Sequence, residues 1–164
     1  MEPGGYADSS LCILLPALSW CYVWLDGGNV AMDFLADTGK VGAEITQERA
    51  KELAEICALN CLAAVELVAP VNMIVKVVRV VCYVNGAPGF LNQPFVANGA
   101  SELFMHIWGD AGIAARSAIG VAELPLNSPV EIELTVEIAE LRGSSANAYL
   151  GGQHQQSILN DRPA

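Results

Sequence analysis

The sequence has few charged residues. Asp, Glu, Lys and Arg make up 16% of its 164 residues, against roughly 25% in an average soluble domain. Hydrophobic residues make up 53%, which excludes intrinsic disorder for most of the chain and predicts that some apolar surface is covered in a subunit interface. Basic residues are the scarcest, with 8 Lys and Arg against 18 Asp and Glu for a net charge of -10. Because Lys and Arg supply most of the affinity for phosphates, this balance argues against nucleic-acid binding.

Signature motifs of cofactor, metal and nucleophilic chemistry are also missing. The sequence contains no Walker loop, no dinucleotide-binding glycine fingerprint and no G-x-S-x-G elbow. His106 and His154 have no partner motif, and the five cysteines include no C-x-x-C pair. We therefore expect no metal and no cofactor. Such cysteines are typical of reduced thiols in a cytoplasmic protein, and Cys57 and Cys61, which join an apolar stripe, are expected to pack in the core.

One long apolar run lies near the start of the chain, from Leu11 to Leu25. It is shorter than the roughly 20 residues that a membrane-spanning helix needs, and Pro16 interrupts it. Acidic Glu2 and Asp8 precede it, whereas a signal peptide begins with basic residues. The run therefore predicts neither a membrane span nor a signal peptide.

The length predicts a single domain, since domains usually contain roughly 100–200 residues. We expect it to occupy residues 1–142, with the place of residues 1–21 in the fold left open. Residues 143–164 are rich in Gly, Ser, Asn and Gln and have few large apolar side chains. That composition predicts a flexible C-terminal tail.

The first half of the chain predicts two strands and a helix. Tyr22–Leu25 and Val30–Leu35 flank the turn Asp26–Asn29, a pattern typical of a hairpin. Thr46 is predicted to be an N-cap, and after it the apolar residues recur at spacings of three and four. This stripe predicts a helix of about five turns, and its apolar members are Ala50, Leu53, Ala54, Cys57, Cys61, Leu62 and Val65.

The second half predicts a strand, a helix and two further strands. Val75–Val84 is rich in β-branched residues, and Asn92–Trp108 returns to helical spacing and stops near Gly109. Ala114–Leu124 and Val130–Ala139 follow as strands. The order ββαβαββ predicts an α+β fold with two helices on one face of a sheet.

The last two strands carry the most informative polar residues. If they form a hairpin about Leu126 and Asn127, Arg116 lies near Glu137, and a cross-strand ion pair would satisfy its charge. The alternative is that Arg116, whose small neighbours leave room beside it, binds a ligand carboxylate through two parallel hydrogen bonds. The residues alone leave both interpretations open.

Glu131 belongs to the polar side of the last strand, whose apolar residues alternate with glutamates. In the hairpin register it lies about six residues, or roughly 20 Å, from Arg116. The two side chains could not hold one small ligand within a chain. A site that used both would have to be completed by a second subunit.

Five further segments are informative: Thr38–Glu44, Cys57–Asn60, Val84–Phe90, Asn98–Leu103 and Ala115–Pro125. Together they resemble the Rid/YjgF family of reactive-intermediate deaminases, also called L-PSP endoribonucleases. The match runs from about Gly39 to Glu140, and Ala115–Pro125 is its most specific block. The resemblance implies a chorismate mutase-like (YjgF-like) fold, a homotrimer and ligand clefts between subunits.

The resemblance also implies roles for single residues. The arginine matching Arg116 holds the carboxylate of an imine or enamine, the glutamate matching Glu131 positions the attacking water, and the asparagine matching Asn98 lines the cleft. Tyr22 matches the tyrosine of the family's first strand with a spacing one residue short. The implied reaction yields a keto acid and ammonia without a cofactor, because a protonated imine is already electrophilic.

Two departures from the family pattern keep a second interpretation open. Family members usually have a Ser-Gly-x-x-Pro stretch after the second strand, whereas here Asp33–Asp37 leads directly into Thr38. In addition, Ala118 occupies the position of a cysteine in the better-known deaminases. The alternative is a non-catalytic trimer that binds a small carboxylic acid. A ribonuclease activity fits poorly with the acidic charge and the absence of a histidine pair.

Overall fold

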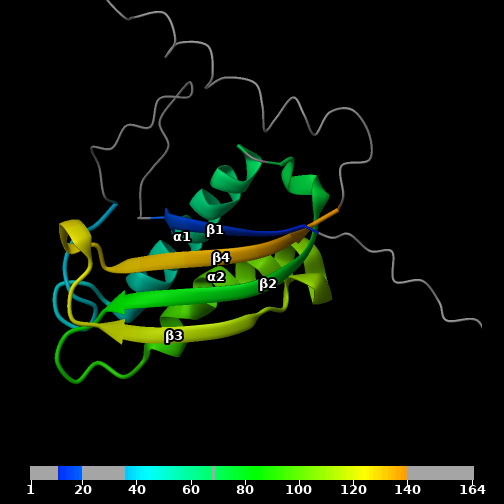
Figure 1. Ribbon diagram of the computed structural model, residues 1–164. Helices are drawn as coiled ribbons and strands as arrows, with labels where there is room; N and C mark the ends of the chain where they lie inside the picture. The colour runs from blue at the N-terminus through cyan, green and yellow to red at the C-terminus, as the bar shows by residue number, and fades with distance from the viewer. Residues whose placement is uncertain (1–10, 20–35, 68, 140–164) are drawn as a thin grey trace, which may run out of the picture.

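The computed structural model describes residues 11–19, 36–67 and 69–139. Within these ranges the chain forms an α+β fold, in which one sheet is covered by two helices (Figure 1). The strands are β1 (Leu11–Ser19), β2 (Ile74–Asn85), β3 (Ala115–Val121) and β4 (Val130–Ile138). The helices are α1 (Gln47–Glu66) and α2 (Gln93–Trp108). Short 3-10 turns cover Val71–Met73, Gly109–Gly112 and Pro125–Asn127.

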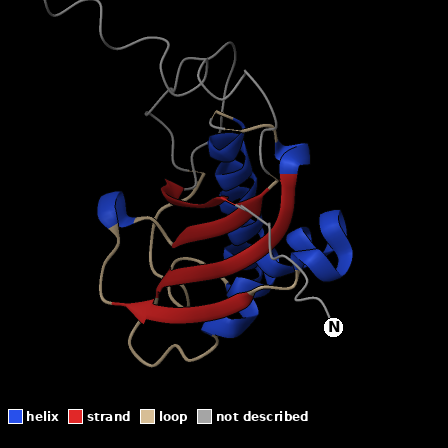
Figure 2. Cartoon of the chain, turned by 45° about the vertical axis from the view of Figure 1, so that its right-hand side comes forward, coloured by secondary structure: helices blue, strands red, loops and turns tan. Residues whose placement is uncertain are grey.

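Both helices lie on one face of the sheet, as the sequence predicts (Figure 2). α1 packs mainly over β4 and β1, and α2 packs over β2 and β3. Side chains between the two layers form the core, which includes the largest fully buried residues Phe104, Leu53, Ile132 and Leu134. Cys57 and Cys61 are buried in this core, which confirms their predicted packing role.

The ends of both helices follow from local sequence signals. Thr46 caps α1, because its side-chain oxygen accepts a hydrogen bond of 3.1 Å from the Arg49 backbone N–H. Pro94 lies in the first turn of α2, and the helix stops at Gly109, whose φ of 57° favours glycine. The predicted start of the first helix and end of the second are confirmed.

The strands are joined in the order β1-β4-β2-β3. β4 is antiparallel to both β1 and β2, and β3 runs parallel to β2. β1 falls within the Leu11–Leu25 run and lies at the edge of the sheet formed by the four described strands. Its pairing with β4 shifts between Leu15 and Ser19, around Pro16, which lacks a backbone N–H and is tolerated at edges and bulges. The strands predicted at 22–25 and 30–35 lie outside the described residues.

The predicted hairpin between the last two strands is wrong. β2 lies between them, so that Arg116 is paired with Val80 and Glu137 with Lys76 and Cys12. The connection from Ala122 to Pro129 is long enough to cross the end of one strand, a step of about 10 Å. Positive φ angles of 53° and 59° at Leu126 and Asn127 turn the chain there without pairing its neighbours. The apolar strand β2 thereby gains a hydrogen-bonded neighbour on each side.

Candidate functional site

Arg116 lies on β3 and reaches the helix above it. Its Nη1 donates hydrogen bonds to Asn98 Oδ1 at 2.8 Å and to Ser101 Oγ at 3.1 Å. Asn98 and Ser101 are three residues apart on α2, so both project from one face of that helix. Ala118 and Gly120 follow Arg116 on the same face of β3, and the side-chain amide of Gln93 lies against Gly120.

The charge of Arg116 is not neutralised by any carboxylate of the described residues. The predicted alternative partner Glu137 belongs to a different part of the sheet, and no described Asp or Glu comes within ion-pair distance. The acceptors that Arg116 does have, an amide and a hydroxyl, are both neutral. The remaining guanidinium N–H groups have no acceptor in the described part of the chain, which leaves the planar edge that pairs with a carboxylate available.

A surface pocket of about 320 Å³ opens beside this arginine. It lies between α2 and the 3-10 turn that leads into β3. Polar and apolar side chains share its walls, together with the backbone around Gly112: Asn98, Ser101, Glu102, Met105, Ile113, Ala114 and Arg116. The pocket therefore offers one unpaired cation, neutral hydrogen-bonding groups and an apolar surface to a small ligand.

Glu131 lies on the opposite face of the sheet from Arg116. Its neighbours Val130 and Ile132 point into the core under the helices, so Glu131 points away from them, beside its register partner Tyr83. Only 6% of Glu131 is exposed, and its carboxyl group has no hydrogen bond or ion pair with the described residues. Burial raises the pKa of Glu131, and the charge of Glu133 raises it further.

Tyr83 and Glu133 complete this polar group on the face of the sheet opposite the helices. The Tyr83 hydroxyl donates a hydrogen bond of 3.1 Å to Glu133 Oε2. Burial and this hydrogen bond both raise the pKa of Tyr83, so the tyrosine stays protonated and keeps donating to the carboxylate. Glu133 therefore holds its position next to Glu131.

Arg116 and Glu131 do not meet within one chain. Their register partners on β2, Val80 and Tyr83, are three residues apart, which places the two backbones about 10 Å apart along the sheet and about 10 Å across it. The hairpin register predicted a separation of roughly 20 Å along the sheet between Arg116 and Glu131, and the observed register corrects this separation to about 10 Å along the sheet. One small ligand cannot contact both side chains within a chain, chiefly because they lie on opposite faces and the sheet itself separates them.

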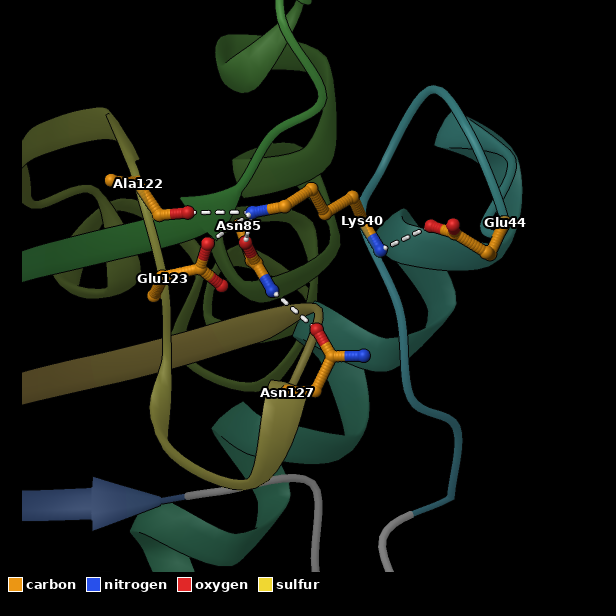
Figure 3. Close-up of polar contacts among 6 residues, drawn as sticks. All are labelled: Lys40, Glu44, Asn85, Ala122, Glu123 and Asn127. Carbon is orange, nitrogen blue, oxygen red and sulfur yellow. Dashed lines mark hydrogen bonds and ion pairs between the residues drawn. The ribbon is translucent and has the colours of Figure 1, made fainter.

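Lys40 forms a second polar cluster, which no motif in the sequence indicates (Figure 3). Its Nζ donates hydrogen bonds to Asn85 Oδ1 at 2.9 Å and to the Ala122 carbonyl at 2.6 Å, and it lies 3.2 Å from Glu123 Oε1. Asn85 is fully buried and donates to Asn127 Oδ1 at 3.2 Å. Because the ammonium group is occupied by these oxygens, Lys40 ties its own loop to the end of β2 and to the connection between β3 and β4, and it is not a free cation.

The other predicted site features are distributed as follows. Tyr22, His154 and the predicted tail 143–164 lie outside the described residues, and His106 is exposed on α2. Ala118 lies two residues beyond Arg116 on the same strand. Among the described residues, no group of three or more His, Cys, Asp or Glu side chains could hold a metal ion. No described helix is long and apolar enough to cross a membrane.

Comparison with known proteins gives similarities over about two thirds of the chain. The crystal structure of the protein Atu1372, of unknown function, from Agrobacterium tumefaciens is 40% identical over 64% of this chain and 68% of that chain, with a TM-score of 0.60. A candidate endoribonuclease from Shewanella oneidensis is 25% identical over 65% of this chain and 72% of that chain, with a TM-score of 0.62.

A curated relative and a family search complete the comparison. The protein TCP17 from Trypanosoma cruzi is 36% identical over 103 residues, which are 62% of this chain. The match spans 64% of the length of that relative. No family model matches the chain.

Proposed function

Since the chain belongs to the Rid/YjgF family, we propose that it hydrolyses small carboxylate-bearing imines or enamines in a cleft that two subunits of a homotrimer share. The observation that carries this proposal is Arg116, a cation that lines a pocket of suitable size and has no described acidic partner. In this proposal Arg116 binds the substrate carboxylate. Asn98 and Ser101 orient the guanidinium from α2.

The reaction needs only a placed water molecule and a proton carrier. Water attacks the carbon of the protonated imine, the C–O bond forms, and the electron pair of the C=N bond returns to nitrogen. Transfer of a proton to that nitrogen makes ammonia the leaving group, and collapse of the carbinolamine gives the keto acid. The sum is one imine and one water converted to one 2-oxo acid and one ammonia.

Glu131 is our candidate for the group that orients water and carries the proton. Its carboxyl is buried, it has no described partner, and its pKa is raised. A carboxyl whose pKa lies above the ordinary value exchanges protons more readily at the pH of the cell than an exposed glutamate does. Within residues 11–19, 36–67 and 69–139, no hydrogen bond to Glu131 would compete with water.

The placement of these two groups supports a shared site. Arg116 and Glu131 are separated by the sheet in one chain, so a substrate bound to Arg116 needs Glu131 from a neighbour. A cyclic trimer brings different surfaces of adjacent subunits together, which is what this arrangement requires. The low charge content of the chain is consistent with covered apolar surface. Tyr22 stays a prediction as a further lining residue.

A coupled assay tests the proposal. Imines are generated in situ from amino acids by an amino-acid oxidase, and the rate of ammonia release is compared for the wild type, Arg116→Ala and Arg116→Lys. We expect acceleration by the wild type, none by Arg116→Ala and a reduced effect by Arg116→Lys, which keeps the charge and loses the planar fork. Equal turnover by wild type and Arg116→Ala would contradict the role of Arg116.

The second candidate function is binding of a small carboxylic acid without catalysis. It is favoured by the pocket itself, in which Arg116, Asn98 and Ser101 are assembled within one chain while Glu131 is not. Ala118, where the better-known deaminases have a thiol, points the same way. Calorimetric titration with 2-oxo acids, carried out beside the ammonia-release assay with imines, separates the two functions. Saturable binding of the 2-oxo acid without ammonia release from imines supports this candidate, and binding together with ammonia release supports the deaminase.

A further inference from the structure

The pocket beside Arg116 also contains features that discriminate between ligands. We infer that Glu102 and the apolar pair Met105 and Ile113 select 2-imino or 2-oxo monocarboxylates with an aliphatic side chain and disfavour dicarboxylates. This inference rests on the proposed function of Arg116 as the carboxylate site. All three residues line the pocket. None of them belongs to the contacts that hold Arg116.

Glu102 places a negative charge on the pocket wall. It follows Ser101 on α2, and its Oε2 lies 2.7 Å from Lys51 Nζ of α1. Lys51 does not line the pocket, so Glu102 is the member of this pair that a ligand meets. Glu102 and Arg116 form no ion pair with each other, so the pocket keeps its positive and negative groups on separate walls.

Met105 and Ile113 present apolar surface on the same pocket. Their exposed fractions are 49% and 59%, high values for large hydrophobic side chains. Met105 lies one helical turn beyond Ser101 and Glu102, and Ile113 follows the 3-10 turn that leads into β3. An aliphatic side chain of a ligand held at Arg116 would cover part of this surface and remove it from water.

These features act differently on two ligands of similar size. An aliphatic 2-oxo acid places its one carboxylate on Arg116 and its side chain on Met105 and Ile113. A dicarboxylic 2-oxo acid places a second negative charge in the pocket near Glu102, where like charges repel. The Lys51 ammonium offsets part of that repulsion from outside the pocket, so we expect the discrimination due to Glu102 to be about fivefold to tenfold.

Calorimetry with two defined probes tests the inference without depending on turnover. The probes are 4-methyl-2-oxopentanoate and 2-oxoglutarate, and the proteins are the wild type, Glu102→Gln, Met105→Ser and Glu55→Gln. Glu55 is an exposed acid on α1 that does not line the pocket, so its variant makes the same charge change elsewhere. Arg116→Ala serves as the control for the carboxylate site itself.

We expect the wild type to bind 4-methyl-2-oxopentanoate more tightly, and Glu102→Gln to reduce the ratio of the two Kd values by about fivefold to tenfold. Met105→Ser should weaken only the aliphatic probe, and Glu55→Gln should change neither. An unchanged ratio in Glu102→Gln, with both probes still lost in Arg116→Ala, would overturn the inference and leave the carboxylate site standing. Binding of neither probe by the wild type, or equal binding by Arg116→Ala, would overturn both.

Discussion

Replacing Gly99 with alanine tests whether the close contact between α1 and α2 keeps the Arg116 pocket in shape. A Cβ at position 99 would lie 2.0 Å from the Lys51 carbonyl oxygen and 3.1 Å from the Glu55 backbone nitrogen. Ordinary contacts are about 3.5 Å, so the helices would have to separate by about 1 Å or more. Overpacking costs about 1–3 kcal/mol, and the better helix propensity of alanine offsets up to about 1 kcal/mol. We expect the free energy of unfolding to fall by about 1–2 kcal/mol.

The assay is urea unfolding of Gly99→Ala beside Gly89→Ala. A Cβ at Gly89 meets no atom within 4 Å, and its φ of +85° adds only backbone strain of about 1–2 kcal/mol. Gly99→Ala should in addition weaken binding of a 2-oxo acid, because Asn98 and Ser101, which hold Arg116, flank the displaced position. A Gly99→Ala protein with unchanged stability and unchanged binding would refute this reasoning, whereas Gly89→Ala should leave binding intact.

Three further substitutions have defined outcomes. Lys40→Met leaves the buried Asn85 side-chain oxygen without its donor, and urea unfolding should show a loss of about 1–3 kcal/mol. Glu131→Gln cannot ionise, so its stability relative to the wild type should rise as the pH increases above the ordinary glutamate pKa of 4.5, as measured by unfolding at a series of pH values. Arg116→Lys should raise the Kd for a 2-oxo acid by about tenfold in calorimetry, with an unchanged urea midpoint.

The sign of the Glu131 effect follows from the direction of its pKa shift. Burial and Glu133 raise the pKa of Glu131 in the folded protein, so the folded state favours the protonated carboxyl. The stability that this provides is fully present below the unfolded pKa and is lost as the pH rises through the folded value. The glutamine side chain does not ionise, so the Glu131→Gln variant does not lose this stability as the pH rises. A relative stability that stayed flat from acidic to neutral pH would show that the carboxyl is not buried as described.

Two controls accompany the other substitutions. Lys76 is exposed on β2, and Lys76→Met should change stability far less than Lys40→Met, since it makes no described ion pair. Similar losses for both lysines would argue against the Lys40 cluster as a structural tie. For Arg116→Lys, a drop in the urea midpoint as large as the loss of binding would indicate a structural role for the guanidinium instead.

The elements that the sequence predicted correctly are those set by local patterns. Thr46 and the apolar stripe after it define α1, and the alternation from Val130 to Ile138 defines β4, because each signal is contained in a short stretch of chain. The pairing of β3 with β2 is a choice between partners far apart in the sequence. A turn at Leu126 and Asn127 is compatible with either choice, which is why the hairpin expectation failed.

Part of the candidate site could be predicted from the sequence, and part of it could be identified only from the structure. The resemblance selected Arg116 and Asn98, but only the structure shows that the asparagine oxygen accepts a hydrogen bond from the guanidinium. Ser101 and Glu102 belong to the same matching segment, but no signal in the sequence separated them from their neighbours. The Lys40 cluster is built from a loop, the end of β2 and the connection between β3 and β4, which are far apart in the sequence, so no spacing along the chain could indicate it.

Mixing two inactive variants tests the shared site most directly. Arg116→Ala and Glu131→Gln are unfolded together in equal amounts and refolded, and ammonia release is measured beside each variant refolded alone. If each site takes Arg116 from one subunit of a trimer and Glu131 from the next, half of the sites have an intact arginine and half of those an intact glutamate. We therefore predict recovery of about one quarter of the wild-type rate in the mixture. A mixture as inactive as the separate variants, in protein that has exchanged subunits, would contradict the account.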